Sequence, residues 1–350
     1  GGILGSCGVV ILAPAVFSSY REWHLVAVAL AILAGVLLAR GRSADGARSC
    51  WRSRPALVVI GVLTVLACLV QRRAEPDLVR PGCRVLNQSR NFHGVLTVVE
   101  YQSDPAERKV NILYHGRIVH GFQLTDAEQH REPTAYFTRG SGLGIVIEEL
   151  RRRRGSLRIG VIGLGVGTIA AYGQAGDRLV FYELDPAVIA LHPKYFSFLS
   201  DCPAEIEVLA GDGRVLLESQ PPQGYDLLVL DAFTGDAIPV HLLTREALMG
   251  YRRHLRPGGV VAYNISNRYV NLLPVAAALA RDAGLPLVYF PPKGQGGEPL
   301  AYPSAWVMLG GEPGLFATPA IAENGRPPPD GLSPVLWTDQ FSNLLAVLKR

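Results

Sequence analysis

Three strongly apolar segments open the chain and differ from everything that follows. They span residues 1–17, 24–39 and 56–70, and charged residues fall only between them. Each segment is a little shorter than the roughly 20 residues that cross a bilayer. We interpret residues 1–72 as transmembrane helices, in preference to a buried helical layer. Because residue 1 lies inside an apolar run, we expect these helices to be the end of a longer membrane region.

Short strand-like runs begin near residue 85. Residues 95–101, 110–114 and 117–123 are rich in β-branched and aromatic side chains, and glycines and an Asp-Pro pair separate them. These runs predict a small antiparallel β-element over residues 85–135.

Strand and helix patterns alternate over residues 141–350. A helix is expected over 141–154, where the terminal arginines suit the negative end of the helix dipole. The expected strands are 157–162, 178–183, 205–210, 225–230 and 259–264. The expected helices are 168–173, 186–199 and 245–255, and a last helix or strand is expected in the tail from residue 337. This alternation predicts an α/β, Rossmann-like domain, with helices on both faces of a parallel sheet.

Composition excludes some classes of function. The net charge of +4 is small, and the arginine run at residues 151–154 lacks the interleaved aromatic residues of a nucleic-acid-binding face, so no nucleic-acid partner is expected. The five cysteines form no CxxC pair and no cluster with histidines at the spacing of zinc ligands. We therefore expect neither a disulfide framework nor a metal site.

A glycine-rich turn follows the first strand of this domain. Gly163, Gly165 and Gly167 lie in Gly163-Leu-Gly-Val-Gly-Thr168, between an expected strand and an expected helix. Glycines allow a sharp turn there and let backbone N–H groups approach a ligand closely. A structural turn would also need glycines, but the strand before and the helix after favour a nucleotide site formed by these three residues.

The end of the next strand carries an acidic motif, Tyr182-Glu-Leu-Asp-Pro186. Glu183 is placed to accept hydrogen bonds from the hydroxyls of a ribose. Asp185, directly before Pro186, is expected to cap the following helix instead.

A third strand end carries Gly211-Asp-Gly-Arg214. Asp212 and Gly213 are placed to meet the exocyclic amine of an adenine, although the same residues would also fit a plain Asp-Gly turn. Three such sites at successive strand ends indicate a nucleotide at the carboxyl edge of the sheet. A dinucleotide-dependent dehydrogenase would require GxGxxG, whereas position 168 is Thr, and it would not require Gly-Asp-Gly.

The segment from Val161 to Asn264 resembles the catalytic core of the spermidine synthase family of aminopropyltransferases. The resemblance rests on the glycine turn, the two acidic motifs, Tyr225-Asp-Leu-Leu-Val-Leu-Asp231 and, less specifically, Leu255-Arg-Pro-Gly-Gly259. The apolar N-terminal segments and the tail Trp337-Thr-Asp-Gln-Phe-Ser-Asn-Leu-Leu345 resemble fused, membrane-bound spermidine-synthase-like proteins. The resemblance implies a class I methyltransferase-type sheet that uses decarboxylated S-adenosylmethionine or S-adenosylmethionine as co-substrate, without a metal.

The resemblance also implies roles for individual residues. In this family an amine attacks the propyl carbon next to a sulfonium, methylthioadenosine leaves, and the enzyme must orient the amine and remove a proton from it. Asp231, at the end of the fourth strand, is then the catalytic residue. Gln123 would contact the nucleotide, although two His-Gly pairs upstream leave its alignment open. The implied partners are a small amine such as putrescine and further copies of the chain in a homo-oligomer.

The amine side of the site departs from the family pattern. The usual Asp-x-x-Asp-Pro is here Asp231-Ala-Phe-Thr-Gly-Asp236, so Thr234 occupies the place of the second acid. The family's Tyr-His-Glu segment has no clear counterpart, and Pro133-Thr-Ala-Tyr136 lies near that place. Asp236, Tyr136 and Thr234 are the candidate substrate residues; alternatives for the first two are a loop residue and a packing residue, and for Asp231 a cap at the strand end.

Three functions remain open at this stage. The first is aminopropyl transfer from decarboxylated S-adenosylmethionine to an amine. The second is another enzyme on the same nucleotide site, either a methyltransferase or a lyase that cleaves S-adenosylmethionine, which the loss of carboxylates favours. The third is a membrane sensor or transporter that binds the nucleotide without catalysis.

The arginines near the apolar segments give opposing indications of membrane topology. The loop at residues 40–54 holds five arginines and one aspartate, which the positive-inside rule places in the cytoplasm. The third segment would then carry the nucleotide domain out of the cytoplasm, where its co-substrate is made. More arginines follow that segment, at positions 72, 73, 80 and 84. We expect an integral membrane protein with a cytoplasmic catalytic domain, and this conflict stays open.

Overall fold

The computed structural model of the chain describes residues 13–19, 26–30, 32–33, 61, 81–102, 108–232, 239–292 and 300–349. Most of the predicted transmembrane region, 1–72, lies outside these ranges, and so do Thr234 and Asp236. Within the described stretches, every helix is too short or too polar to traverse a bilayer. The membrane segments therefore stay a prediction.

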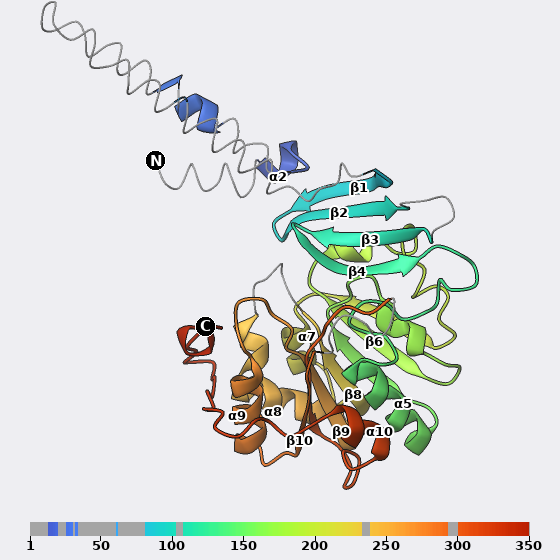
Figure 1. The fold of residues 1–350 in the computed structure, drawn as a ribbon, viewed down its shortest axis with the longest axis vertical. Coiled ribbons are helices and arrows are strands. Elements are labelled where there is room, and N and C mark those ends of the chain that lie inside the picture. Colours follow the sequence, from blue (N-terminus) through green and yellow to red (C-terminus); the bar gives the residue numbers. More distant parts are fainter. Residues whose placement is uncertain are drawn as a thin grey trace, which may run out of the picture. The chain divides into compact units, whose positions relative to one another are not determined.

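A four-stranded sheet comes first in the chain. Its strands are β1 (Cys83–Asn91), β2 (Gly94–Tyr101), β3 (Val110–His115) and β4 (Ile118–Leu124), in the order β1-β2-β3-β4 (Figure 1). Two-residue connections join β1 to β2 and β3 to β4, as only antiparallel neighbours allow. The three expected strands are confirmed. The sequence analysis missed β1 because its positions are half-exposed and show no alternation of apolar and polar residues.

The chain divides into two compact units, residues 1–99 with 114–117, and residues 100–113 with 118–350. The limits expected for the β-element and for the nucleotide domain, 85–135 and 141–350, remain predictions.

A seven-stranded sheet forms the centre of the second unit. Its order is β10-β11-β9-β8-β5-β6-β7. Five strands run parallel to one another, as predicted: β5 (Arg158–Ile162), β6 (Arg178–Glu183), β7 (Glu205–Ala210), β8 (Tyr225–Leu230) and β9 (Leu255–Asn264). Two further strands, β10 (Leu287–Phe290) and β11 (Trp306–Gly310), extend the sheet in antiparallel fashion. The strand order reverses on either side of β5, which is where open α/β sheets bind ligands.

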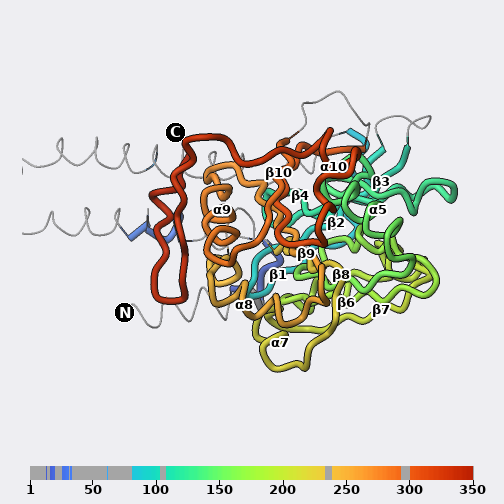
Figure 2. The backbone as a smooth tube through the Cα atoms, turned by 90° about the horizontal axis from the view of Figure 1, so that it is seen from below, coloured from blue at the N-terminus to red at the C-terminus, as the bar shows by residue number. Residues whose placement is uncertain are grey.

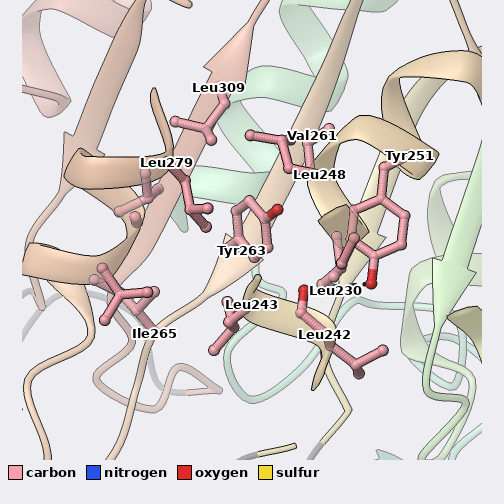
Figure 3. Close-up of a cluster of buried hydrophobic side chains, with 14 of the residues drawn as sticks. Leu230, Leu242, Leu243, Leu248, Tyr251, Val261, Tyr263, Ile265, Leu279 and Leu309 are labelled. Carbon is pink, nitrogen blue, oxygen red and sulfur yellow. Dashed lines mark hydrogen bonds between the residues drawn. The ribbon is translucent and has the colours of Figure 1, made fainter. Parts of the chain in front are cut away.

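Helices cover both faces of this sheet (Figure 1). The helices α8 (Arg245–His254) and α9 (Leu273–Asp282) pack on one face, where Leu248, Tyr251 and Leu279 meet Val261 and Tyr263 of β9 in a large apolar cluster (Figure 3). The helices α5 (Gly142–Arg154) and α10 (Pro319–Asn324) contact one another beside β10 and β11. Ser141 caps α5, and a shorter helix, α7 (Gly213–Ser219), follows β7.

Two expected helices differ from the prediction, one in type and the other in length. The segment 168–173 forms a 3-10 turn, η2 (Thr168–Tyr172), because glycines flank both of its ends. The segment 186–199 is helical only in α6 (Pro186–Ile189), and turns follow it. Pro193 has no N–H to continue a helical ladder through this segment. The prediction of a continuous helix over 186–199 was wrong.

The C-terminal tail is held by hydrogen bonds more than by regular structure. After α10 it runs back along the α9 side of the sheet (Figure 2), and the expected final helix or strand is only a 3-10 turn, η4 (Leu345–Val347). Trp337 is fully buried and its carbonyl accepts the N–H of Arg245. Asp339 forms a two-pronged pair with Arg214, with Nη1–Oδ1 at 2.8 Å and Nη2–Oδ2 at 2.6 Å. The tail is thereby joined to the residue that ends the Gly-Asp-Gly-Arg motif.

Buried ion pairs fix the amino-terminal edge of the sheet. Asp226, at the start of β8, is fully buried; it pairs with Arg154 at the end of α5 and accepts the N–H of Arg158 at 2.7 Å. Arg151 pairs with the buried Asp177 at 2.7 Å. Burial alone would raise the pKa of Asp177, but hydrogen bonds from Arg151 and from two backbone N–H groups hold that pKa below its usual value. The arginine run therefore joins α5 to the sheet.

We expect Asp226→Asn to destabilise the domain by about 3 kcal/mol, because the substitution removes the buried charge that pairs with Arg154 and leaves Glu312, which is 41% exposed, to compensate that guanidinium. Arg152→Gln is the matched control, since Arg152 is 64% exposed in its pair with Glu149. An exposed pair of this kind contributes about 1 kcal/mol or less. Urea denaturation followed by circular dichroism measures both. Equal losses in the two variants would contradict the assignment of Asp226 as an anchor.

The Asp339–Arg214 pair predicts an acid-sensitive contribution to stability. The hydrogen bonds from Arg214 lower the pKa of Asp339 from its usual value to about 2. A carboxyl whose folded pKa is depressed stabilises the fold above its unfolded pKa of about 4 and loses that effect as pH falls through the folded pKa. At pH 6 the wild-type protein should therefore unfold at a higher urea concentration than Asp339→Asn. This difference between the two unfolding midpoints should become smaller below about pH 4. Asp330→Asn, an exposed carboxylate earlier in the tail, should show no such gap.

Candidate active site

Backbone hydrogen bonds bring the four predicted strand ends together at the carboxyl edge of the sheet. The N–H of Gly163 donates to the carbonyl of Tyr182, and the N–H of Gly211 donates to the carbonyl of Glu183, both at 2.8 Å. The N–H of Asp231 donates to the carbonyl of Ile162 at 2.9 Å. The glycine turn, both acidic motifs and Asp231 thus form one continuous edge, as the sequence predicted.

The glycine turn needs its glycines for conformation and for space. Gly163, Gly165 and Gly167 all have positive φ, at 99°, 53° and 78°. A side chain on Gly163 would overlap the carbonyl oxygen of Asp231, the residue that follows β8. Gly163 therefore allows the ends of β5 and β8 to approach each other closely, and it sets the distance between the turn and Asp231.

Glu183 holds the glycine turn in place from the end of β6. One carboxylate oxygen accepts the N–H of Leu164 and the other accepts the N–H of Asp185, both at 2.8 Å. Glu183 is 8% exposed, and its contact with the ribose hydroxyls stays a prediction. Asp185 accepts the N–H of Ala187 at 2.9 Å, which confirms it as the helix cap.

Asp212 is the N-cap of α7. Its Oδ1 accepts the N–H groups of Arg214 and Val215, at 2.9 and 3.1 Å, and its Oδ2 lies 2.9 Å from Nε2 of His241. Gly213 sits close against Ile162, so a side chain there would collide with β5. The contact of Asp212 and Gly213 with an adenine stays a prediction, and His241 is a neighbour that sequence reasoning missed.

Asp231 is a half-buried residue that directly follows β8. Burial raises its pKa to about 7, against the opposing hydrogen bond from Asn264. The Nδ2 of Asn264 donates to Oδ1 of Asp231 at 2.6 Å. A carboxyl that titrates near neutrality is suited to proton transfer, because its acid and base forms are both accessible at working pH.

Tyr136 lies within electrostatic reach of Asp231. Burial raises the pKa of the Tyr136 hydroxyl, and the charge of Asp231 raises it further. The hydroxyl donates to the carbonyl of Val119 on β4. The structure therefore brings Tyr136 near the candidate base, while Thr234 and Asp236 lie outside the described residues.

Gln123, on β4, makes hydrogen bonds with both ends of its amide. Its oxygen accepts the N–H of Ser197 at 2.7 Å, and its nitrogen donates to the carbonyl of His130 at 2.7 Å and to the Ser197 hydroxyl at 3.0 Å. Gln123 is 3% exposed. These contacts tie β4 to the segment after α6, and the role of Gln123 toward a nucleotide stays a prediction.

Sequence reasoning missed two more residues at this edge. The Nε2 of His192 lies 3.2 Å from the carbonyl of Gly165, and burial lowers the pKa of this imidazole. No motif marks His192. Asn264 could have been found, because it ends the next parallel strand after Asp231. Among the described residues, no group of three His, Cys, Asp or Glu is placed to hold a metal ion.

Comparisons with curated proteins identify partial relatives. No protein-family model matches the chain. A polyamine aminopropyltransferase of Vibrio vulnificus is 37% identical over 114 residues, which are 31% of this chain and 37% of that protein. An N-terminal histidine N-methyltransferase of Emericella nidulans is 36% identical over 109 residues, 30% of this chain and 19% of the relative. A probable polyamine aminopropyl transferase of Bifidobacterium longum is 32% identical over 109 residues, 30% of this chain and 23% of the relative.

Solved structures with similar folds include spermidine synthases and methyltransferases. A probable spermidine synthase from Corynebacterium glutamicum is 17% identical, with a TM-score of 0.49, and covers 66% of this chain and 80% of its own. Spermidine synthase from Thermotoga maritima is 15% identical, with a TM-score of 0.44, and the match covers 65% of this chain and 72% of that protein. Human methyltransferase-like protein 13 is 19% identical, with a TM-score of 0.38, and the match covers 51% of this chain and 86% of that protein.

The matched region spans about a third or less of the length of each curated relative. Two of those three relatives are aminopropyltransferases by name. Over that region the chain is similar to polyamine aminopropyltransferases, and the resemblance to the spermidine synthase family that its motifs indicated is confirmed.

Proposed function

We propose that the chain is a membrane-anchored, spermidine-synthase-like enzyme that transfers an aminopropyl group from decarboxylated S-adenosylmethionine to an amine. The observation that carries this proposal is the single edge formed by the glycine turn, Glu183, Asp212 and Asp231. The two aminopropyltransferases among the relatives support the reaction class.

The chemistry assigned to this edge is a nucleophilic substitution. The turn and Glu183 hold the nucleotide, and Asp212 faces its adenine. The amine nitrogen attacks the propyl carbon attached to the sulfonium; the new C–N bond forms as the C–S bond breaks, and that electron pair neutralises the sulfur of methylthioadenosine. Asp231, in its ionised form, accepts the proton that the amine loses. The amine is a small one such as putrescine, with Tyr136, Thr234 and Asp236 as candidate contacts.

Membrane anchoring is proposed from the three apolar segments of residues 1–72 alone. The catalytic domain is placed in the cytoplasm, because the co-substrate is made there. A homo-oligomer is a further part of this proposal, taken from the family resemblance.

A second candidate is a methyltransferase or a lyase that uses S-adenosylmethionine at the same nucleotide site. One observation favours it: a histidine N-methyltransferase matches over nearly the same length as the aminopropyltransferases do. The replacement of the family's second acid by Thr234 points the same way.

We expect methylthioadenosine and a new amine only when decarboxylated S-adenosylmethionine and putrescine are both supplied to the purified chain. Mass spectrometry of the products measures this, with S-adenosylmethionine and the amine-free mixtures as controls. Methylthioadenosine without an amine would establish a lyase, and S-adenosylhomocysteine would establish a methyltransferase.

Asp231→Asn should lower turnover by about 10²–10⁴-fold, the usual contribution of a general base, while nucleotide binding persists. Because burial raises the pKa of Asp231 to about 7, the base is protonated below that pH, and kcat/KM should rise as pH increases through about 7. Full activity in Asp231→Asn, or a rate independent of pH between 6 and 8, would remove Asp231 from the reaction.

Glu183→Gln should weaken binding of methylthioadenosine by about tenfold or more, since a hydrogen bond to a charged group contributes about 1.5–3 kcal/mol. The amide can also no longer accept both backbone N–H groups. Asp185→Asn is the matched control, because it retains the Oδ1 that caps α6. Isothermal titration calorimetry measures both affinities, and equal affinities would place the ribose elsewhere.

A further inference from the structure

Asn264 lies beside the candidate base at the carboxyl edge of the sheet. It is the last residue of β9, and Asp231 follows the last residue of β8, the neighbouring parallel strand. The register pairs Leu230 with Tyr263, so Asp231 and Asn264 come next to each other in the two strands. The Nδ2 of Asn264 donates to Oδ1 of Asp231 at 2.6 Å, and Asn264 is 6% exposed.

The amide of Asn264 has a defined orientation. The backbone N–H of Ser266 donates to its side-chain oxygen at 2.9 Å. A backbone N–H can only donate, so the atom that accepts it must be the oxygen, and the NH2 group must then point toward Asp231. Ser266 is itself held, because its hydroxyl accepts the N–H of Ala305 at 2.9 Å. The N–H of Ile265 donates to the carbonyl of Ala305, also at 2.9 Å.

We propose that Asn264 is a positioning residue for the reaction assigned above: its fixed amide holds Oδ1 of Asp231 in its ionised form and leaves Oδ2 to accept the proton of the amine. This inference rests on the proposed function for the identity of the reaction, but its geometry does not. The hydrogen bond from Asn264 reaches Oδ1 and not Oδ2, so the amide distinguishes the two oxygens of this carboxylate.

The amide of Asn264 and the burial of Asp231 have opposite effects on the pKa of Asp231. Burial favours the neutral acid and raises the pKa of Asp231, whereas the N–H bond from Asn264 favours the carboxylate and lowers it. An asparagine can provide this donor without adding a charge. A lysine or arginine in the same place would hold the carboxylate far more strongly and make it a poor base at neutral pH.

The test compares two variants with the wild-type full chain. Asn264→Leu removes the donor at similar size, and Asn264→Asp keeps the shape and the bond from Ser266 while placing a second carboxyl against Asp231. In both variants the pH of half-maximal kcat/KM should move upward. For the leucine variant the shift should be about one pH unit or more, because one pH unit corresponds in energy to one modest charge-assisted hydrogen bond. At pH 7 the leucine variant should lose about fivefold in kcat/KM for a shift of one unit, and should regain most of it near pH 9.

A second readout does not depend on turnover. Difference infrared spectra between each protein and its own Asp231→Asn counterpart follow the protonation of Asp231 directly. This titration should move upward in both Asn264 variants and stay in place in Asn267→Ala, because the side-chain oxygen of Asn267 accepts the backbone N–H groups of Tyr269 and Val270 in the same segment.

The outcomes separate the two proposals. A wild-type chain without aminopropyl transfer, but with a titration that shifts in the variants, would overturn the proposed reaction and support the role of Asn264. An unchanged titration of Asp231 in a folded Asn264→Asp protein would overturn the role of Asn264, whatever the activity. A shift of equal size in Asn267→Ala would do so as well.

Discussion

The buried pair of Arg154 and Asp226 is the contact on which the nucleotide domain depends most. A buried charge is tolerated only when it is paired and hydrogen-bonded, and Asp226 meets that condition with a guanidinium from α5 and a backbone N–H from β5. Asp177 meets it in the same way with Arg151 and the N–H of Leu157. These bonds join the helix before the first strand to the amino-terminal edge of the sheet. Ion pairs at the amino-terminal edge therefore fix the strands whose other ends meet at the carboxyl-terminal edge.

Glu183 and Asp231, at the carboxyl-terminal edge of the sheet, differ in the hydrogen bonds that their carboxylates accept. Glu183 accepts a backbone N–H at each oxygen, so its charge is well compensated and it serves to hold the glycine turn. Asp231 accepts an amide N–H at one oxygen, but the effect of desolvation is larger and raises its pKa to about 7. Under the proposed function, this difference suits Glu183 to binding and Asp231 to proton transfer.

Much of this arrangement could be predicted from the sequence because it follows from periodicity and from strand ends. The parallel strands have continuous apolar patterns, and parallel strands place their ends at one edge, so Gly163, Glu183 and Asp231 come together from topology alone. The prediction of a helix over 186–199 was wrong because it gave more weight to the spacing of apolar residues than to Pro193. The pairs Arg214–Asp339 and Asp231–Asn264 could not be predicted with the same ease, since both join segments far apart in the chain through side-chain geometry. Position at a strand end was the one signal available for Asn264.

The surroundings of Tyr136 show how the amine side of this edge is built. Ala135 has a φ of 56°, a conformation that costs a residue with a side chain of order 1–3 kcal/mol and persists only where neighbours enforce it. Its N–H donates to Leu300 and its carbonyl accepts the N–H of Tyr302, so the segment before β11 holds this turn. The turn directs Tyr136 toward Tyr302, whose ring centroid lies 6.1 Å away, and brings the Tyr136 hydroxyl under the influence of Asp231. The strain at Ala135 therefore places the ring of Tyr136 near the candidate base.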